Sequence, residues 1–396
     1  MAISCPAAED ESEDSEDSEV PYPLCFESQN DQSNKRAVED VIGIPMPRGK
    51  VDLTNYTLPP TPHFFTFEAG SKRLHVRNTL PACNPHLVRG SIFFLHGYGA
   101  HINHPMLHQW LQRLAAAGYA IFSFDFPGHG YSPGERAYVK DFEEFLSAYM
   151  EFVHLVRTTP TSKGSTFDFG IAIEGLLQAA RQKPFFIIGE SMGGLLALVT
   201  SQRVRRDITL AASFGGTVLL APALKVDMPP EAVIYLIRHA VVPLMPSSIM
   251  PAFLSKSASV PISAIIRDEE MADKVQKDNW GEAKGGLGWR NGMRWVTINA
   301  FTLLMQNLPE VMSSSEGPML VLHDPQDAIA HFGGSERLME LSPSKDKALI
   351  KMEDARHDIA SNEPETSASH VIEWLAKHRS LRFNNYVHNM RPHMRF

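Results

Sequence analysis

The sequence predicts an α/β fold in which helices cover both faces of a mostly parallel sheet and a helical cap follows the sixth strand. Three observations support this prediction. Short β-like runs alternate with longer helical patterns along most of the chain. One buried run, FFIIG, stops at a Gly-Glu-Ser-Met-Gly turn and leads directly into a helical pattern. Residues 222–316 interrupt the alternation, which then resumes.

The first half of the chain contains three strand-like runs, FFTF, RLHVRN and SIFFLH, of which the last is apolar enough to be buried on both faces. LHQWLQRLAAAG then has leucines at helical spacing and ends at Gly118, which suits the residue after a helix. YAIFSF follows as a strand. The next helix runs from Asp141 to Val156, with Asp141 as N-cap and Glu144 completing a capping box.

The second half continues with IAIEGLLQAARQ, FFIIGES, GGLLALVTSQRV and TVLLAPAL, which predict helix, strand, helix and strand in turn. Residues 222–316 are rich in Met, Pro and aliphatic residues and helical in pattern, so we interpret them as the cap. PMLVLHD, SERLMEL, KALIKME and ETSASHVIEWLAKH then resume the alternation. The predicted core therefore comprises residues 51–221 and 317–380, and ligands of such sheets bind at the carboxyl ends of the strands.

Composition excludes several classes of function. The 396 residues are 43% hydrophobic and 21% charged, as in ordinary soluble domains. A net charge of −8 without a Lys/Arg stripe argues against nucleic-acid binding. Three cysteines and a beginning that lacks the pattern of a signal peptide predict a cytoplasmic protein without a disulfide framework. Residues 1–50 have the composition of a disordered acidic tail, and residues 381–396 form a C-terminal tail.

Ser191 occupies the turn between the buried strand FFIIG and the helix MGGLLALV. The glycines two residues before and after it relieve crowding in a sharp strand-to-helix turn, which would expose the hydroxyl above the sheet. A serine hydroxyl is a weak nucleophile and needs a positioned base and an orienting acid. Ser191 is therefore the candidate nucleophile, and the acid and the histidine should follow it in the chain.

The candidate base is His357, in the ARHD loop between the last strand and the last helix. LHDPQDAI offers two acids, Asp324 and Asp327. Asp327 is preferred because it stands three residues into the loop, and Asp324 remains the alternative. For the oxyanion, the backbone N–H of Met192 is the first candidate donor, and the N–H of Tyr98, in the HGYG loop after the third strand, is the second.

These motifs make the resemblance to a known family specific. HGYGAH, DFPGHGYSPG, GESMGG, DPQD and ARHD occur in the order and approximate spacing of the monoacylglycerol lipase and lysophospholipase-like branch of the α/β-hydrolases, also called serine aminopeptidase-like. The chain resembles this family from about Thr61 to His378. GESMGG and SPSKDKAL are similar to its plant members, including caffeoylshikimate esterase-like proteins.

The resemblance implies an α/β-hydrolase fold and a serine esterase that cleaves monoacylglycerols or lysophospholipids through an acyl-enzyme, without a cofactor or metal. It also implies the roles given above for Ser191, Asp327, His357 and the two amides. The chain departs from the family at two positions. His323-Asp324 replaces the usual His-Gly before the acid turn, and Asp354 replaces the glycine usually found three residues before the histidine.

The cap sequence favours a lipid substrate. AVIYLIRHAVVPLMPSSIMPAFL is strongly apolar but is interrupted by charged and proline residues, so it suits a surface that contacts a membrane peripherally rather than a spanning helix. Ile234, Leu236 and Met245 are the candidate substrate-binding residues of this segment. His101, His104 and His108 lack the spacing of a metal site, and no metal is expected.

Three alternatives remain open for the function. The same triad could serve an acyltransferase or thioesterase, or an esterase of hydroxycinnamoyl esters. A protein of another class, a ligand-binding α/β-hydrolase-fold protein without catalysis, is the third. A lipid ester is the expected small-molecule partner, and the sequence does not indicate an oligomeric state.

Overall fold

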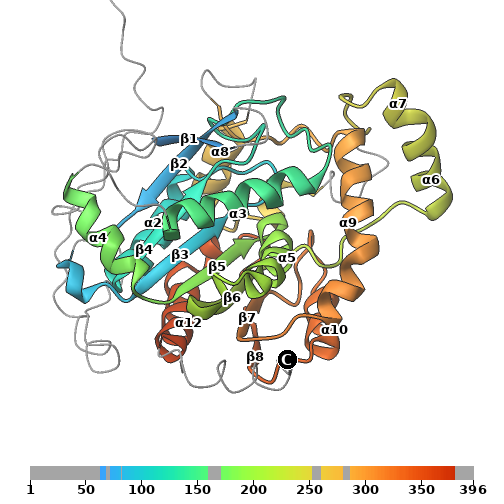
Figure 1. Ribbon diagram of the computed structural model, residues 1–396. Helices are drawn as coiled ribbons and strands as arrows, with labels where there is room; N and C mark the ends of the chain where they lie inside the picture. Colours follow the sequence, from blue (N-terminus) through green and yellow to red (C-terminus); the bar gives the residue numbers. More distant parts are fainter. Residues whose placement is uncertain are drawn as a thin grey trace, which may run out of the picture.

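The computed structural model describes residues 63–67, 72–81, 83–158, 171–251, 260–279 and 286–379. The two predicted tails, residues 1–50 and 381–396, lie outside this part of the chain. Within it, eight strands form one sheet in the order β1-β2-β4-β3-β5-β6-β7-β8 (Figure 1). The strands are β1 (His63–Phe67), β2 (Lys72–Thr79), β3 (Gly90–Leu95), β4 (Tyr119–Phe124), β5 (Phe185–Glu190), β6 (Phe214–Leu220), β7 (Met319–His323) and β8 (Lys347–Lys351).

The sheet is mostly parallel, as predicted. β2 pairs antiparallel with β1 and β4, and the pairs from β4 to β8 are all parallel. β3, β4 and β6 are buried along their whole length, and β5 is buried up to its last residue, Glu190. Apolar side chains on both faces of these central strands require helices on both sides, which explains why the runs lack polar alternation.

Helices cover the two faces of the sheet and bury separate hydrophobic clusters. One cluster lies beneath α3 (Phe142–Thr158), α4 (Ile171–Arg181) and α5 (Met192–Arg206). The other lies beneath α2 (Pro105–Ala116) and α12 (Pro364–His378). The remaining helical elements of the core are η1 (Pro85–Leu87), η2 (Ala211–Ser213), α10 (Gly333–Leu341) and α11 (Ile359–Asn362). The short helix α11 was not predicted from the sequence.

The described residues between β6 and β7 form the helical cap predicted after the sixth strand. Its elements are α6 (Glu231–Leu236), the π-helical turn η3 (Ile237–Val241), α7 (Val242–Leu244), η6 (Ile262–Ala264), α8 (Glu269–Lys277) and α9 (Trp295–Ser313). Ile237, Met250, Trp295 and Ile298 pack together and hold η3 against α9. α6 and α7 stand out from the core beside α9 (Figure 1). No helix in the described residues has both the length and the apolar character that crossing a membrane requires.

Parallel strands bring their following loops to one edge of the sheet, and these loops carry the predicted site residues. The HGYG loop follows β3, Ser191 follows β5, the DPQD turn follows β7, and His357 follows β8. This architecture is the α/β-hydrolase fold that the resemblance implies.

Candidate active site

Ser191 lies in a strained turn between β5 and α5. Its φ is 56° and its ψ is −119°, which is unusual for a residue with a side chain. The turn is possible because the residues two positions before and two positions after Ser191 are glycines. A Cβ on Gly189 would lie 2.1 Å from the carbonyl oxygen of Gly193, and a Cβ on Gly193 would lie 2.1 Å from that of Leu95. Residues at these two positions must therefore lack a side chain for the hydroxyl to be presented above the sheet.

A chain of two hydrogen bonds joins Ser191, His357 and Asp327. The Ser191 hydroxyl donates to Nε2 of His357 at 2.8 Å, and Nδ1 of His357 donates to Oδ2 of Asp327 at 2.7 Å. The Asp327 side chain is fully buried, and that of His357 is 10% exposed. Because Nδ1 carries the proton that it donates to the carboxylate, Nε2 has a free lone pair. Nε2 can therefore accept the proton of a hydroxyl as that hydroxyl attacks a substrate.

The Asp327 carboxylate is held ionised by its hydrogen-bond donors. Burial by itself would raise the pKa of Asp327, but His357 and further donors lower it well below its usual range. Oδ1 accepts from the amides of Ile329 and Ala330 at 2.7 and 3.0 Å. His323, the last residue of β7, lies 3.2 Å from Oδ2 through its Nε2.

His323 was not recognised from the sequence as part of this site. Its Nε2 also donates to the carbonyl of Ala330 at 2.9 Å, and its Nδ1 accepts from the Ser335 hydroxyl at 2.7 Å. This orientation lets one imidazole N–H support both Asp327 and the loop that carries it. The available signal was position alone, because His323 is the strand-end residue directly before the DPQD turn.

Asp324, the alternative acid, binds backbone instead of the histidine side chain. Oδ1 accepts from the amide of Gln326 at 2.8 Å, and Oδ2 accepts from the amide of Arg356 at 2.6 Å. Arg356 and Asp354 both have positive φ, of 54° and 61°. The two departures from the family pattern therefore lie in one structural unit. Asp354 begins a loop with positive φ values, and Asp324 accepts a hydrogen bond from the Arg356 amide of the same loop.

The two residues with the candidate oxyanion donors line the same cavity as Ser191. Met192 is the first residue of α5, where a helix leaves its backbone N–H without an intrahelical acceptor. Tyr98 lines the same cavity as Ser191 and Met192. The loop before Tyr98 is held by His96, whose Nδ1 donates to the Gly97 carbonyl at 2.8 Å and whose Nε2 accepts from the Phe126 amide at 3.1 Å. Burial lowers the pKa of His96 to about 4, so this imidazole is neutral and keeps that tautomer.

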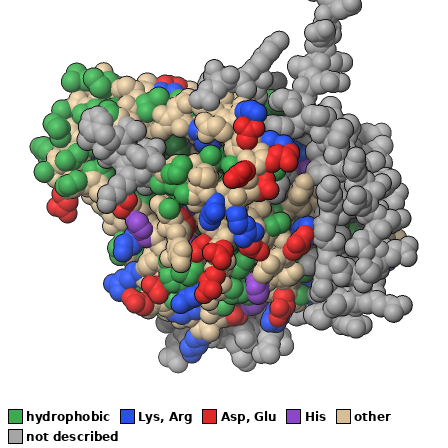
Figure 2. Space-filling view, turned by 180° about the vertical axis from the view of Figure 1, so that it is seen from behind, with side chains coloured by type: hydrophobic (Ala, Val, Ile, Leu, Met, Phe, Trp, Pro, Cys, Tyr) green, Lys and Arg blue, Asp and Glu red, His purple; other side chains and the backbone are tan. Residues whose placement is uncertain are grey.

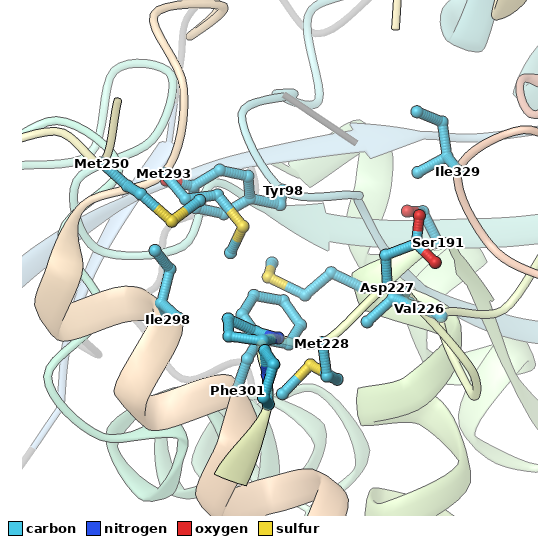
Figure 3. A pocket seen from close by; sticks show the side chains of 14 residues that line it. Tyr98, Ser191, Val226, Asp227, Met228, Met250, Met293, Ile298, Phe301 and Ile329 are labelled. Carbon is cyan, nitrogen blue, oxygen red and sulfur yellow. The ribbon is translucent and has the colours of Figure 1, made fainter. Parts of the chain in front are cut away.

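Ser191 opens onto an apolar cavity of about 360 Å³. In Figure 3, Met250, Met293 and Ile298 gather at one side of the cavity and Ser191 lies at the other. Phe301 and Met228 lie between them. The remaining lining residues are Tyr98, Met192, Ala223, Val226, Asp227, Pro229, Pro230 and Ile329. Flexible methionines and apolar walls suit a ligand with a long hydrocarbon chain.

The three cap residues predicted to bind substrate are not among those that line this cavity. Leu236 and Met245 are 56% and 51% exposed, and Ile234 is half-buried on α6. α9 and the residues just before α6 supply the lining instead. Ile234, Leu236 and Met245 lie on helical segments that stand away from the core, so the apolar character of their sequence reflects an outer surface.

Comparisons with known proteins agree with this fold. Residues 86–365 match the family described as Serine aminopeptidase, S33. The caffeoylshikimate esterase of Arabidopsis thaliana is 24% identical over 78% of this chain and 83% of its own length. The monoacylglycerol lipase of Mycolicibacterium smegmatis is 24% identical over 73% of this chain and 89% of its own.

The solved structures show the same fold. A soluble variant of the monoglyceride lipase of Saccharomyces cerevisiae, in complex with a substrate analogue, superposes with a TM-score of 0.60 at 19% identity. The superposition covers 85% of this chain and 99% of the lipase. The chain therefore belongs to the Serine aminopeptidase, S33, family of α/β-hydrolases and is a serine hydrolase similar to monoacylglycerol lipases.

Proposed function

We propose that this enzyme hydrolyses lipid monoesters, either monoacylglycerols or lysophospholipids, through an acyl-enzyme on Ser191. The observation that carries the proposal is the hydrogen-bonded chain Ser191–His357–Asp327, whose serine lines an apolar cavity. Relatives named monoacylglycerol lipase support the substrate class.

Acylation begins when Oγ of Ser191 attacks the ester carbonyl carbon and its proton passes to Nε2 of His357. Asp327 stays ionised and stabilises the imidazolium through the Nδ1–H bond, which its lowered pKa supports. The backbone N–H groups of Tyr98 and Met192 stabilise the oxyanion of the tetrahedral intermediate.

The second half of the reaction returns the enzyme to its starting state. As the intermediate collapses, Nε2–H of His357 protonates the departing alcohol and leaves the acyl group on Oγ. Water then attacks the acyl-enzyme with His357 as the general base, which releases a fatty acid.

The cavity supports a long acyl chain rather than an acetyl group. Its apolar wall extends from Ser191 toward Met250, Met293 and Ile298 (Figure 3). Asp227 supplies a carboxylate to the lining and pairs with His331 at 3.0 Å, which provides hydrogen-bonding groups for the hydroxyls of a glycerol head.

A panel of p-nitrophenyl esters of increasing chain length, with 1-monoacylglycerols and lysophospholipids beside it, tests the proposal. We expect kcat/KM to rise with each methylene, by up to about 0.8 kcal/mol of transition-state binding, and to level off when the cavity is full. Labelling with a fluorophosphonate should modify Ser191. Equal kcat/KM for acetate and long-chain esters would disprove a lipid substrate.

A phenolic ester is the second candidate substrate, because one relative is named caffeoylshikimate esterase. The same panel decides between the two when it includes a hydroxycinnamoyl ester. A higher kcat/KM for that ester than for every lipid ester would replace the lipid proposal.

We also propose that α6, η3 and α7 contact a lipid surface, so that a cytoplasmic enzyme could take its substrate from a membrane. Hydrophobic side chains gather over these elements (Figure 2, upper left). The exposed apolar residues of this patch are Val233, Tyr235, Leu236, Leu244 and Met245. The patch adjoins the cavity, because the lining residue Pro230 is also the N-cap of α6.

Substitution of Leu236 or Leu244 by Asp tests this surface. We expect several-fold lower turnover of a long-chain ester presented in vesicles and unchanged turnover of a soluble short-chain ester. Ile208→Asp is the matched control, since Ile208 is 90% exposed but lies after α5, outside the patch. Equal loss in the patch variants and in the control would argue against a membrane-contacting role.

A further inference from the structure

A second, smaller cavity borders Glu190, the residue before Ser191. Its volume is about 50 Å³, and it shares no lining residue with the apolar cavity. Its lining carries more charged and polar side chains than that of the larger cavity, which is mainly apolar. The titratable residues in its lining are His96, His101, His104, Glu190, Asp278, Arg290 and Asp358. The described residues contain no cluster of these side chains that could hold a metal ion.

Glu190 brings a carboxyl group into this cavity from the end of β5. Its Oε1 is buried and has no hydrogen-bond partner in the described residues. Asp358 lines the same small cavity, and the carboxyl groups of Glu190 and Asp358 interact electrostatically there. Two ionised carboxylates close together in a buried site repel each other strongly, which favours a proton on one of the two.

The surroundings of the two carboxyl groups differ. Asp358 is the N-cap of α11, where Oδ1 accepts from the amide of Ser361 at 3.1 Å, and it interacts electrostatically with Arg290 of the cap. Asp358 therefore accepts from an amide and faces a cation, whereas Oε1 of Glu190 has no hydrogen-bond partner in the described residues. Burial, and then the neighbouring charge of Asp358, raise the pKa of Glu190 well above its ordinary value.

Two histidines of the lining supply no positive charge beside Glu190. Burial lowers the pKa of His96 and of His104 to about 4, so both imidazoles are neutral near pH 7. His101 is paired with Asp278 at 2.7 Å. Arg290, which interacts with both Asp278 and Asp358, is the cation of this cavity.

We propose that Glu190 is a positioning residue that, as a neutral carboxylic acid, donates a hydrogen bond to Asp358 and so ties the turn of Ser191 to the loop of His357. The proposal rests on the proposed roles of these two residues. Asp358 directly follows His357, and Glu190 directly precedes Ser191. A hydrogen bond between Glu190 and Asp358 therefore fixes the distance between the Ser191 hydroxyl and the His357 imidazole.

The loop needs such a tie because its backbone conformation is not intrinsically favoured. Asp354 and Arg356 both have positive φ. Asp324 holds the loop at the Arg356 amide, before His357. The Glu190–Asp358 bond holds it immediately after His357, so that the histidine is fixed from both sides.

Two substitutions of Glu190 separate a hydrogen bond from mere space filling. Glu190→Gln keeps the shape and an N–H donor toward Asp358, and we expect kcat for a soluble ester within about threefold of the original. Glu190→Leu removes the donor, and we expect kcat lower by about 10- to 100-fold with KM little changed. Equal activity of the two variants would overturn the proposal.

Infrared spectroscopy tests the protonation state without substrate. The folded enzyme at pH 7 should show a carbonyl band of a protonated carboxylic acid that is absent from Glu190→Gln. Asp358→Asn removes the charge that favours the proton, so the band should disappear at a lower pH than in the original enzyme. Asp268→Asn is the matched control, because Asp268 is an exposed N-cap residue of α8 and accepts from Met271.

Absence of a band that depends on Glu190, or an identical pH dependence in Asp358→Asn, would overturn the proposal. Fluorophosphonate labelling distinguishes this result from a failure of the proposed function. If the original enzyme does not react with the probe, the assigned role of Ser191 fails, whereas the infrared band still reports on Glu190 and Asp358.

Discussion

The two cavities beside Ser191 differ in size, lining and consequence. The larger one, of about 360 Å³, is mainly apolar and is lined by Ser191, whereas the smaller one, of about 50 Å³, is rich in charged side chains and is lined by Glu190. Two consecutive residues at the end of β5, Glu190 and Ser191, thus line different cavities. The comparison teaches that one turn can present a nucleophile to an apolar ligand while a buried hydrogen bond behind it secures the geometry.

The largest effect should come from the apolar side. We predict that Ser191→Ala lowers the kcat of ester hydrolysis by about 10⁶-fold without unfolding the enzyme, because the remaining groups have no nucleophile to activate. Steady-state kinetics with a soluble ester and circular dichroism check this expectation. A folded variant that keeps more than a few per cent of the activity would remove Ser191 from the mechanism.

Asp327 and Asp324 provide a matched pair at the carboxyl end of β7. Asp327→Asn should lower kcat by about 10⁴-fold, because an amide in place of the carboxylate neither fixes the histidine tautomer nor stabilises the imidazolium. Asp324→Asn should cost less than about tenfold, since Asp324 contacts backbone amides. Kinetics of the two variants on one ester decide between them, and a larger loss in Asp324→Asn would contradict the assignment.

The far wall of the apolar cavity should set the length of the accepted acyl chain. Ile298→Trp places bulk opposite Ser191 (Figure 3), so we predict about a 10- to 100-fold loss of kcat/KM for long-chain esters and little change for short ones. Leu303→Trp is the control, because Leu303 lies on the same helix, outside the cavity lining, and is 43% exposed. A uniform loss over all chain lengths would indicate disturbed folding rather than a shortened cavity.

The sequence was sufficient to predict the fold and which loops lie at the carboxyl edge of the sheet, because the order of parallel strands brings these positions together. It was not sufficient for the cavity walls. Apolar cap residues such as Leu236 and Met245 look alike in sequence whether they face a ligand or solvent, and only the packing of η3 against α9 decides this. Glu190 was also missed, since its partner Asp358 is distant in the chain.

The raised pKa of Glu190 should make the free energy of unfolding depend on pH. In the unfolded chain Glu190 ionises near pH 4.3, at about its reference pKa, whereas in the folded enzyme its raised pKa keeps the proton bound. Between these two pKa values the folded state holds one more proton than the unfolded state. The contribution of Glu190 to the free energy of unfolding therefore falls by about 1.4 kcal/mol per pH unit as the pH rises.

Glu190→Gln removes this contribution, because glutamine is neutral in both states. We predict that the variant gains stability over the original enzyme as the pH rises above about 4.3, and that the difference becomes constant above the folded pKa. Urea denaturation from pH 4 to 8, expressed as free energy of unfolding, provides the measurement. Parallel pH profiles of the two proteins would mean that Glu190 ionises normally in the folded enzyme.

The smallest predicted effect concerns the loop that carries His357. Asp354 has a φ of 61°, a conformation that glycine adopts without strain and that aspartate tolerates better than most residues. We expect Asp354→Gly to raise the free energy of unfolding by at most about 0.5–1 kcal/mol, because relief of strain is partly offset by the entropy of glycine in the unfolded chain. Asp354→Ala should lower the free energy of unfolding, since alanine keeps the strain and loses the local tolerance of aspartate.

Arg356 also has a positive φ but is no substitute for this test, because its guanidinium binds the carbonyls of Ser263 and Ile266 and a glycine would remove both contacts. Thermal unfolding of the Gly and Ala variants gives the order of stability, and an alanine variant as stable as the glycine variant would show that the loop is held by its anchors at Asp324 and Glu190 alone.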